Sequence, residues 1–118
     1  MIKITVPNIP PSNNEFMGNS HSFRAYQERK EEWHWLVKAA IREKPVRPFA
    51  KATVTITYFF PDRRRRDPDN YSGKFILDAL VKEGIIKDDN FFVINLQLKA
   101  EMDRARVRTE ITVEGEEG

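Results

Sequence analysis

Acidic and arginine side chains gather in one short stretch near the middle of the chain, residues 61–70. There Asp67 and Asp69 flank a single proline, and a second acidic pair, Asp88 and Asp89, comes later in the sequence. Carboxylate oxygens suit Mg²⁺, which phosphoryl-transfer sites usually hold through one or two carboxylates together with water. Arginine binds phosphate oxygens through paired N–H donors. The stretch therefore indicates chemistry on a phosphate ester, and its four consecutive arginines, here called the arginine block, are Arg63, Arg64, Arg65 and Arg66.

Each of these features has a simpler interpretation when it is taken alone. An Asp-Pro-Asp sequence is more often a helix cap than a metal site, and a run of arginines more often forms a solvent-exposed or interface face. Three carboxylates at one edge also repel one another, by on the order of 4 kcal/mol per pair at about 4 Å and an effective dielectric of about 20. A divalent ion or the arginines themselves would offset this repulsion, so the residues alone leave both interpretations open.

The secondary structure that must position these residues follows from the spacing of apolar side chains. Four segments alternate apolar and polar residues, the pattern of strands with one buried face. Two others repeat apolar residues at three and four, the pattern of helices. This order predicts a two-layer α+β domain, in which two helices cover one face of a mixed β-sheet in the order β-α-β-α-β-β. The expected strands are residues 2–6, 51–60, 92–100 and 105–113, and the expected helices are residues 24–43 and 68–83.

The arginine block must leave the packed layer of the sheet. If the alternation of strand 51–60 continued, Arg64 and Arg66 would point into the core, and burial of unpaired guanidinium groups is too costly. We therefore expect the block and the aspartates after it at an edge of the domain, where Asp67 would be the N-cap of helix 68–83.

The return after helix 68–83, which Gly84 is suited to end, decides whether the second acidic pair joins the first. We expect this return to pair with the sheet and to bring Asp89 back beside Asp67 and Asp69. All three carboxylates would then share one edge of the domain.

The composition of the chain excludes several classes of protein. With 118 residues the chain is expected to form one domain, residues 1–118, and the absence of cysteine excludes disulfides and cysteine-ligated metals. Because there is neither a long apolar run nor a signal peptide, we expect a soluble, cytoplasmic protein with no membrane partner. The formal charge of +2 is only mildly basic, so a nucleic-acid partner is indicated by the arginine block and not by the average. The polar loop 7–23 is long enough to suggest a binding role.

The chain resembles the RusA family of Holliday junction resolvases. The resemblance is carried by residues 62–70 (Asp-Arg-Arg-Arg-Arg-Asp-Pro-Asp-Asn), residues 78–80 (Asp-Ala-Leu), the pair Asp88 and Asp89, and the opening residues 10–14 (Pro-Pro-Ser-Asn-Asn). It extends across nearly the whole chain. It implies a Mg²⁺-dependent endonuclease, with Mn²⁺ as a substitute for Mg²⁺, that resolves four-way DNA junctions by paired incisions. It also implies that the enzyme acts as a homodimer.

The resemblance implies roles for individual residues as well. Asp67, Asp69 and Asp89 match the family's three catalytic, metal-binding aspartates. Lys74 matches its essential lysine when counted back from Asp78, although one extra residue separates it from Asp69. The carboxylates would hold the ion that lowers the pKa of a bound water, and Lys74 would stabilise the charged transition state. The arginines would hold the DNA backbone without reading its sequence, and the full set expected to contact DNA is Arg63, Arg64, Arg65, Arg66, Asn70, Asn13 and Asn14.

One residue bears on the implied homodimer. At 100° per residue, Phe75 lies opposite the apolar stripe of helix 68–83, so we expect it on the surface, either alone or within an interface. Two-fold symmetry favours the interface, because a four-way junction offers two equivalent scissile phosphates.

Two alternatives come from other classes of protein. One is a non-catalytic nucleic-acid-binding module, in which the aspartates cap a helix and pair with arginines. The other is a structural or regulatory protein that has kept the fold and lost the activity. Cleavage of branched DNA that depends on a divalent ion separates the enzyme from both.

Overall fold

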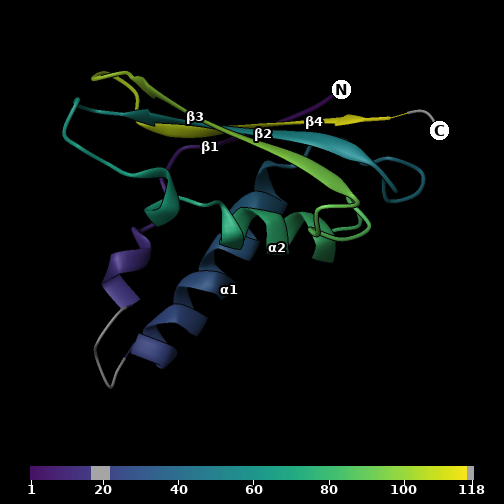
Figure 1. The fold of residues 1–118 in the computed structure, drawn as a ribbon, viewed down its shortest axis with the longest axis horizontal. Coiled ribbons are helices and arrows are strands. Elements are labelled where there is room, and N and C mark those ends of the chain that lie inside the picture. The colour runs from purple at the N-terminus through teal and green to yellow at the C-terminus, as the bar shows by residue number, and fades with distance from the viewer. Residues whose placement is uncertain (17–21, 117–118) are drawn as a thin grey trace.

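A computed structural model describes the chain over residues 1–16 and 22–116. Within these residues the chain forms a four-stranded mixed sheet and two α-helices that lie on the same face of it (Figure 1). The predicted order β-α-β-α-β-β and the α+β class are confirmed. The predicted binding loop 7–23 includes residues 17–21, which lie outside the described residues. The elements are β1 (Ile2–Val6), η1 (Asn13–Phe16), α1 (Ser22–Ala40), β2 (Ala52–Phe60), η2 (Pro68–Asn70), α2 (Lys74–Lys82), β3 (Ile94–Met102) and β4 (Arg108–Gly115).

The sheet has the strand order β1-β4-β2-β3. β2 pairs parallel with β3, from Ala52 opposite Ile94 to Phe60 opposite Met102. β2 also pairs antiparallel with β4, and β4 pairs antiparallel with β1. The alternation predicted for β2 is confirmed, because every second side chain of this strand is buried. β3 forms one edge of the sheet, and its side chains after Ile94 are half-buried or exposed.

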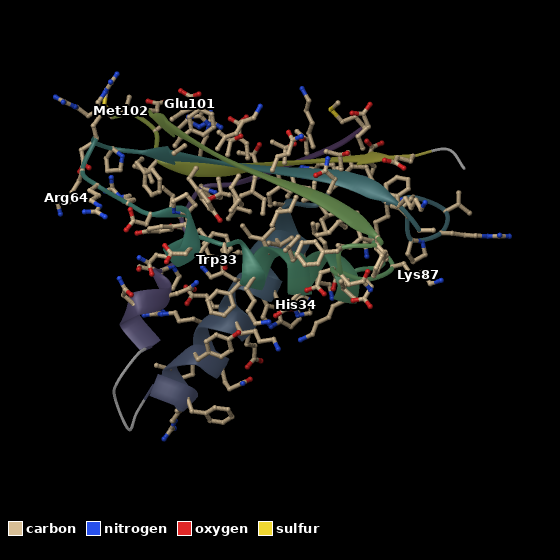
Figure 2. The ribbon with its side chains drawn as sticks, in the orientation of Figure 1. Trp33, His34, Arg64, Lys87, Glu101 and Met102 are labelled. Atoms are coloured by element: carbon tan, nitrogen blue, oxygen red, sulfur yellow. The ribbon has the colours of Figure 1, made fainter. Side chains whose placement is uncertain are left out.

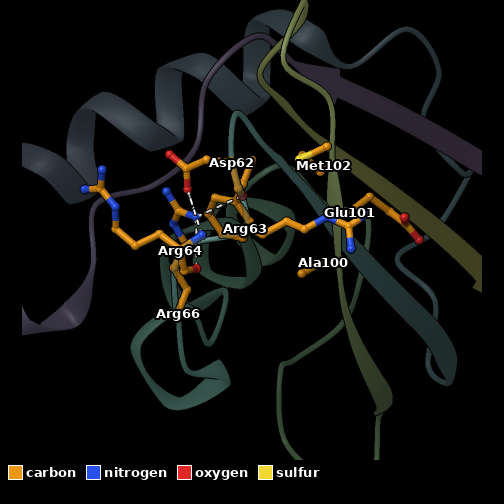
Figure 3. A pocket seen from close by; sticks show the side chains of 8 residues that line it. Asp62, Arg63, Arg64, Arg66, Ala100, Glu101 and Met102 are labelled. Atoms are coloured by element: carbon orange, nitrogen blue, oxygen red, sulfur yellow. Dashed lines mark hydrogen bonds and ion pairs between the residues drawn. The ribbon is translucent and has the colours of Figure 1, made fainter.

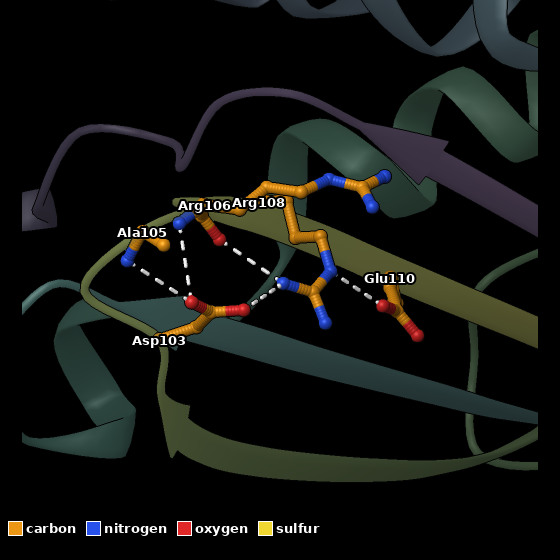
Figure 4. Close-up of polar contacts among 5 residues, drawn as sticks. All are labelled: Asp103, Ala105, Arg106, Arg108 and Glu110. Carbon is orange, nitrogen blue, oxygen red and sulfur yellow. Dashed lines mark hydrogen bonds and ion pairs between the residues drawn. The ribbon is translucent and has the colours of Figure 1, made fainter.

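β3 and β4 begin later than their alternating sequences predicted, at Ile94 and Arg108. The turn before β4 is held by Asp103, whose Oδ1 accepts hydrogen bonds from the backbone N–H groups of Ala105 and Arg106, both at 3.1 Å (Figure 4). Arg108 then donates to Asp103 Oδ2 at 2.7 Å, and this hydrogen bond holds the pKa of Asp103 below its usual value. These polar contacts specify a tight turn where the apolar alternation alone predicted a strand.

The helix predicted over residues 68–83 is broken in two by Gly73. Pro68–Asn70 forms only the short turn η2, and α2 begins at Lys74 after Gly73 adopts a positive φ of 81°. The chain passes so close to β2 here that a Cβ on residue 73 would lie 2.5 Å from Ile56 Cδ1. A continuous helix cannot include a residue of this conformation. Asp67 consequently precedes a short turn and makes no side-chain capping hydrogen bond.

α2 is covered on more than one side, which the predicted apolar stripe did not show. Phe75, expected on the surface, is only 5% exposed. Its ring lies 5.1 Å from that of Tyr26 on α1. The prediction was wrong because α2 packs against α1 as well as against the sheet, so residues outside a single stripe are also buried. Phe75 therefore gives no support to a dimer.

Candidate active site

The arginine block leaves β2 directly after Phe60, and one of its members folds back on the loop. Arg66 is 18% exposed; its guanidinium donates to Asp62 Oδ1 at 2.8 Å and to the Arg64 carbonyl at 3.2 Å. It also lies 4.3 Å from the ring centre of Phe60. The hydrogen bond from Arg66, followed by one from the Arg64 backbone N–H, holds the pKa of Asp62 below its usual value. Arg66 thus holds the loop in shape.

The other arginines lie in solvent around an open cleft at this end of the sheet. Arg63 and Arg64 are exposed and line the cleft together with Met102 and Glu101 at the end of β3 (Figure 3). The cleft has a volume of about 310 Å³. Two free-standing guanidinium groups at an open surface are suited to the phosphates of a nucleic-acid backbone, which need charge and access more than a deep pocket.

Asp67 and Asp69 follow the arginine block at once and are here called the acidic turn. Asp67 Oδ1 lies 3.3 Å from Arg65 Nε, and both side chains are well exposed, at 47% and 89%. Asn13, from the N-terminal loop, donates from Nδ2 to the Asp69 carbonyl at 2.9 Å. The Asp69 side chain is exposed. Asn13 therefore fixes the backbone of the acidic turn while both carboxylates stay open to water.

Three aromatic rings form the floor beneath the acidic turn. The ring of Tyr58 lies 5.9 Å from Phe60 and 5.8 Å from Tyr71, and the rings of Phe60 and Tyr71 are 5.3 Å apart. Tyr58 Oη donates to the Tyr71 carbonyl at 2.9 Å, and burial raises the pKa of Tyr58 well above its usual value. Sequence reasoning missed the supporting role of Tyr58 and Tyr71. The only signal was a tyrosine at a buried position late in strand 51–60.

The structure gathers most of the other predicted site residues at the same end of the molecule. Lys74, the first residue of α2, is exposed and lines a crevice together with Asn13 and Asn70. Asn14 is exposed beside Asn13. The arginine block, the acidic turn, Lys74 and the three asparagines thus share one end of the fold, although their positions in the sequence are far apart.

Asp89 lies elsewhere. The return after α2 does pair, as expected: Phe49 N donates to the Ile85 carbonyl and Lys87 N donates to the Phe49 carbonyl, both at 2.9 Å. Phe49, however, precedes β2, whereas the acidic turn follows it. In Figure 2, Lys87 and Arg64 lie at opposite ends of the molecule.

The two groups of aspartates are therefore separated by the length of the central strand. β2 has nine residues, which span about 27 Å at ~3.3 Å per residue. Among the described residues, no three acidic or histidine side chains lie close enough together to hold a metal ion. The expectation that Asp89 returns beside Asp67 and Asp69 is not met within a single chain.

A mixed α+β fold with an arginine block beside exposed carboxylates is typical of a protein that acts on nucleic acid. Comparison with known families agrees: the family of endodeoxyribonuclease RusA matches residues 7–114. The chain belongs to the RusA endodeoxyribonuclease family, whose members are nucleases that act on DNA junctions. No curated protein matches the chain. Within the described residues, neither helix combines the length and apolar character needed to cross a lipid bilayer.

Proposed function

We propose that this protein is a divalent-metal-dependent endonuclease that resolves four-way DNA junctions by paired phosphodiester hydrolysis as a homodimer. The observation that carries the proposal is the contact between the arginine block and the acidic turn, where phosphate-binding groups adjoin water-exposed carboxylates. Arginines alone would explain binding. Carboxylates beside them would repel a phosphate unless a cation lies between the two, and this favours a metal-dependent enzyme.

The carboxylates of the acidic turn fit a hard divalent cation. Both are open to solvent, so a Mg²⁺ or Mn²⁺ ion held by Asp67 and Asp69 would keep several of its water ligands, as Mg²⁺ usually does. When bound, such an ion lowers the pKa of a ligated water and neutralises charge on the scissile phosphate. Asp89 would be the third ligand.

A two-fold dimer supplies Asp89 from the second copy. Each protomer carries the acidic turn at one end and Asp89 at the other. Antiparallel apposition of two copies would place the Asp89 of each beside the acidic turn of the other. Both sites of the dimer would then be complete, whereas a monomer would have none. This arrangement suits paired incision, because a four-way junction presents two equivalent scissile phosphates.

The remaining side chains have positioning and charge roles in this proposal. Arg63 and Arg64 bind the DNA backbone at the open cleft, and Arg66 keeps their loop in shape through Asp62. Lys74 directs its ammonium toward the developing charge at the scissile phosphate. Asn13 holds the backbone of the acidic turn, so its contribution to catalysis comes through Asp69.

Cleavage of a synthetic four-way junction tests the function. We expect paired cuts in Mg²⁺, none in excess EDTA, and none on a linear duplex of the same sequence. Asp67→Asn, Asp69→Asn and Asp89→Asn should each abolish cutting and leave junction binding intact or tighter, since each removes a ligand and a repulsive charge. Full activity in EDTA, or an active Asp69→Asn protein, would sink the metal mechanism.

One observation favours a non-catalytic binding module as the second candidate. The ion pair between Arg65 and Asp67 shows that the arginines can neutralise the acidic turn without a metal. In that case junction binding would be unchanged by Mg²⁺, and none of the three Asp→Asn proteins would differ from wild type in any cleavage assay.

A further inference from the structure

The loop that carries Asp89 also displays two large aromatic side chains to solvent. Phe91 is 98% exposed and Phe92 is 88% exposed. Adjacent aromatic residues this exposed are unusual on a surface that contacts only water, and such patches mark interaction sites. These two residues, here called the phenylalanine pair, are not used by the fold, because they take no part in the core cluster.

The loop presents the phenylalanine pair on an ordered turn. Asn90 Oδ1 accepts a hydrogen bond from the Phe92 backbone N–H at 2.9 Å, and the Asn90 carbonyl accepts from Val93 and Ile94 at 3.1 Å. Asn90 Nδ2 in turn donates to Asp88 Oδ2 at 3.1 Å. Because the turn is fixed, little conformational entropy remains to be lost when the rings are buried.

At the other end of the molecule lies an apolar cleft of matching chemistry, here called the aromatic cleft. Its walls include Tyr58, Phe60 and Tyr71, together with Leu98 on the edge strand β3, and Asp67 stands at its rim. The Tyr58 hydroxyl is already satisfied by the Tyr71 carbonyl, so the cleft offers rings and not unpaired polar atoms. Aromatic rings are favourable partners for one another.

We propose that the phenylalanine pair of one protomer docks in the aromatic cleft of a second copy of this chain, and so holds the dimer together. The inference rests on the dimer of the proposed function. There, Asp89 must reach the partner's acidic turn, and Phe91 and Phe92 are two and three residues away from Asp89 in the sequence. Any apposition that joins the carboxylates therefore also brings these rings to the cleft at whose rim Asp67 stands.

Charge and area both fit a second copy. The docking loop carries Asp88 and Asp89, and the surface that receives it carries the arginine block and Lys99. Each phenylalanine would bury on the order of 150–200 Å², so the pair accounts for roughly half of the ~800 Å² that each partner contributes to a standard interface. Because each protomer has one loop and one cleft, the contact closes as a two-fold dimer without leaving free ends.

Sedimentation of the full-length protein without DNA or metal tests the inference. We expect wild type to be a dimer, and the double variant Phe91→Ser, Phe92→Ser to raise the dimer dissociation constant by roughly tenfold or more, as loss of a central aromatic anchor does. Ala100→Arg, which places a charge in the aromatic cleft, should have the same effect from the other side. The matched control is Phe23→Ser on α1, an exposed phenylalanine outside both surfaces.

The outcomes separate the inference from the proposed function. A weakened dimer in both variants, with the melting temperature and the Phe23→Ser dimer unchanged, supports the docking. A normal dimer in the double variant overturns it, and so does a wild-type monomer at concentrations that support cleavage. If the variant dimerises normally but binds a four-way junction less tightly, the rings stack on DNA bases instead. A wild-type dimer that depends on the phenylalanine pair yet never cleaves DNA would refute only the proposed nuclease.

Discussion

At the scale of single residues, the arginine block divides into two roles that its sequence does not distinguish. Arg63 and Arg64 are exposed at the open cleft, whereas Arg66 is held by Asp62 and covers the ring of Phe60. The adjacency of the block to Asp67 and Asp69 was predictable from sequence, because the three features are contiguous. The role of Arg66 was not, since it depends on how the loop after Phe60 folds back.

Arg64→Ala and Arg66→Ala should therefore fail in different ways. We expect Arg64→Ala to weaken junction binding about equally for all DNA sequences, and to make the log–log salt dependence shallower by roughly one unit per lost phosphate contact. Arg66→Ala should lower the free energy of unfolding by about 1–2 kcal/mol, since it removes charge-assisted hydrogen bonds and a ring contact. Binding titrations at several salt concentrations and urea unfolding measure the two effects. Equal salt slopes for wild type and Arg64→Ala would contradict the assignment.

At the scale of elements, the apolar periodicity predicted the class and order of the strands and helices but not the break at Gly73. That break depends on the close approach of the chain to Ile56 on β2, a contact between segments that local sequence does not reveal. The same limit explains Phe75: the stripe on α2 predicted one buried face, and packing between α1 and the sheet buried more.

A pair of glycine substitutions checks the account of α2. Gly73 and Gly84 both have positive φ, at 81° and 75°. A Cβ at Gly73 would meet Ile56, whereas a Cβ at Gly84 would meet nothing within 4 Å. We expect Gly84→Ala to cost about 1 kcal/mol from backbone strain alone, and Gly73→Ala to cost several kcal/mol because strain and overpacking add. Equal losses in urea unfolding would show that the approach to β2 is relaxed in solution.

The end of α2 is fastened to α1 by Glu83, and this contact should be sensitive to acid. Glu83 accepts from His34 Nε2 at 2.7 Å and from Lys44 at 3.1 Å. The hydrogen bond from His34, followed by that from Lys44, lowers the pKa of Glu83 below its ordinary value of 4.5. A carboxyl whose pKa is lower in the folded state stabilises the fold above its unfolded pKa and loses that contribution as pH falls through the folded pKa.

Glu83→Gln should therefore cost about 1–3 kcal/mol at pH 7 and progressively less as the pH drops below 4.5. The stability of wild type would fall more steeply with acid than that of the variant. Unfolding curves between neutral and acidic pH give the comparison, with Glu31→Gln on the exposed face of α1 as the control. Parallel pH profiles for wild type and Glu83→Gln would show that the contact contributes nothing.

At the scale of the whole molecule, the position of Asp89 was the part of the candidate site that sequence could not predict. Pairing of the return segment was expected and occurs, but sequence spacing does not say to which end of β2 the chain returns. The direction of α2 decides this, and it places Asp89 away from Asp67 and Asp69. The carboxylates that were grouped by resemblance are thus grouped in space only if two chains meet.

Mixed dimers of two inactive proteins test this arrangement. If each site takes its acidic turn from one protomer and Asp89 from the other, a dimer of Asp69→Asn with Asp89→Asn has one intact site and should nick one strand. A dimer of Asp67→Asn with Asp69→Asn has no intact site and should stay inactive, which makes it the matched control. Differently tagged subunits, purified through both tags, allow the assay on a junction. No activity in the first mixture would mean that the three aspartates do not combine across the dimer.

The pairing of β1 with β4 has a consequence for how the protein is made. The first strand of the chain lies against the last, from Ile2 opposite Val113 to Val6 opposite Thr109, and β4 alone connects it to the rest of the sheet. A ribosome therefore releases β1 long before its hydrogen-bonding partner exists, and its apolar face must wait for nearly the whole of translation. Contacts between such distant segments slow folding and prolong exposure to aggregation. A nascent chain arrested before residue 108 should hence show protease-sensitive β1, protected only once β4 has emerged.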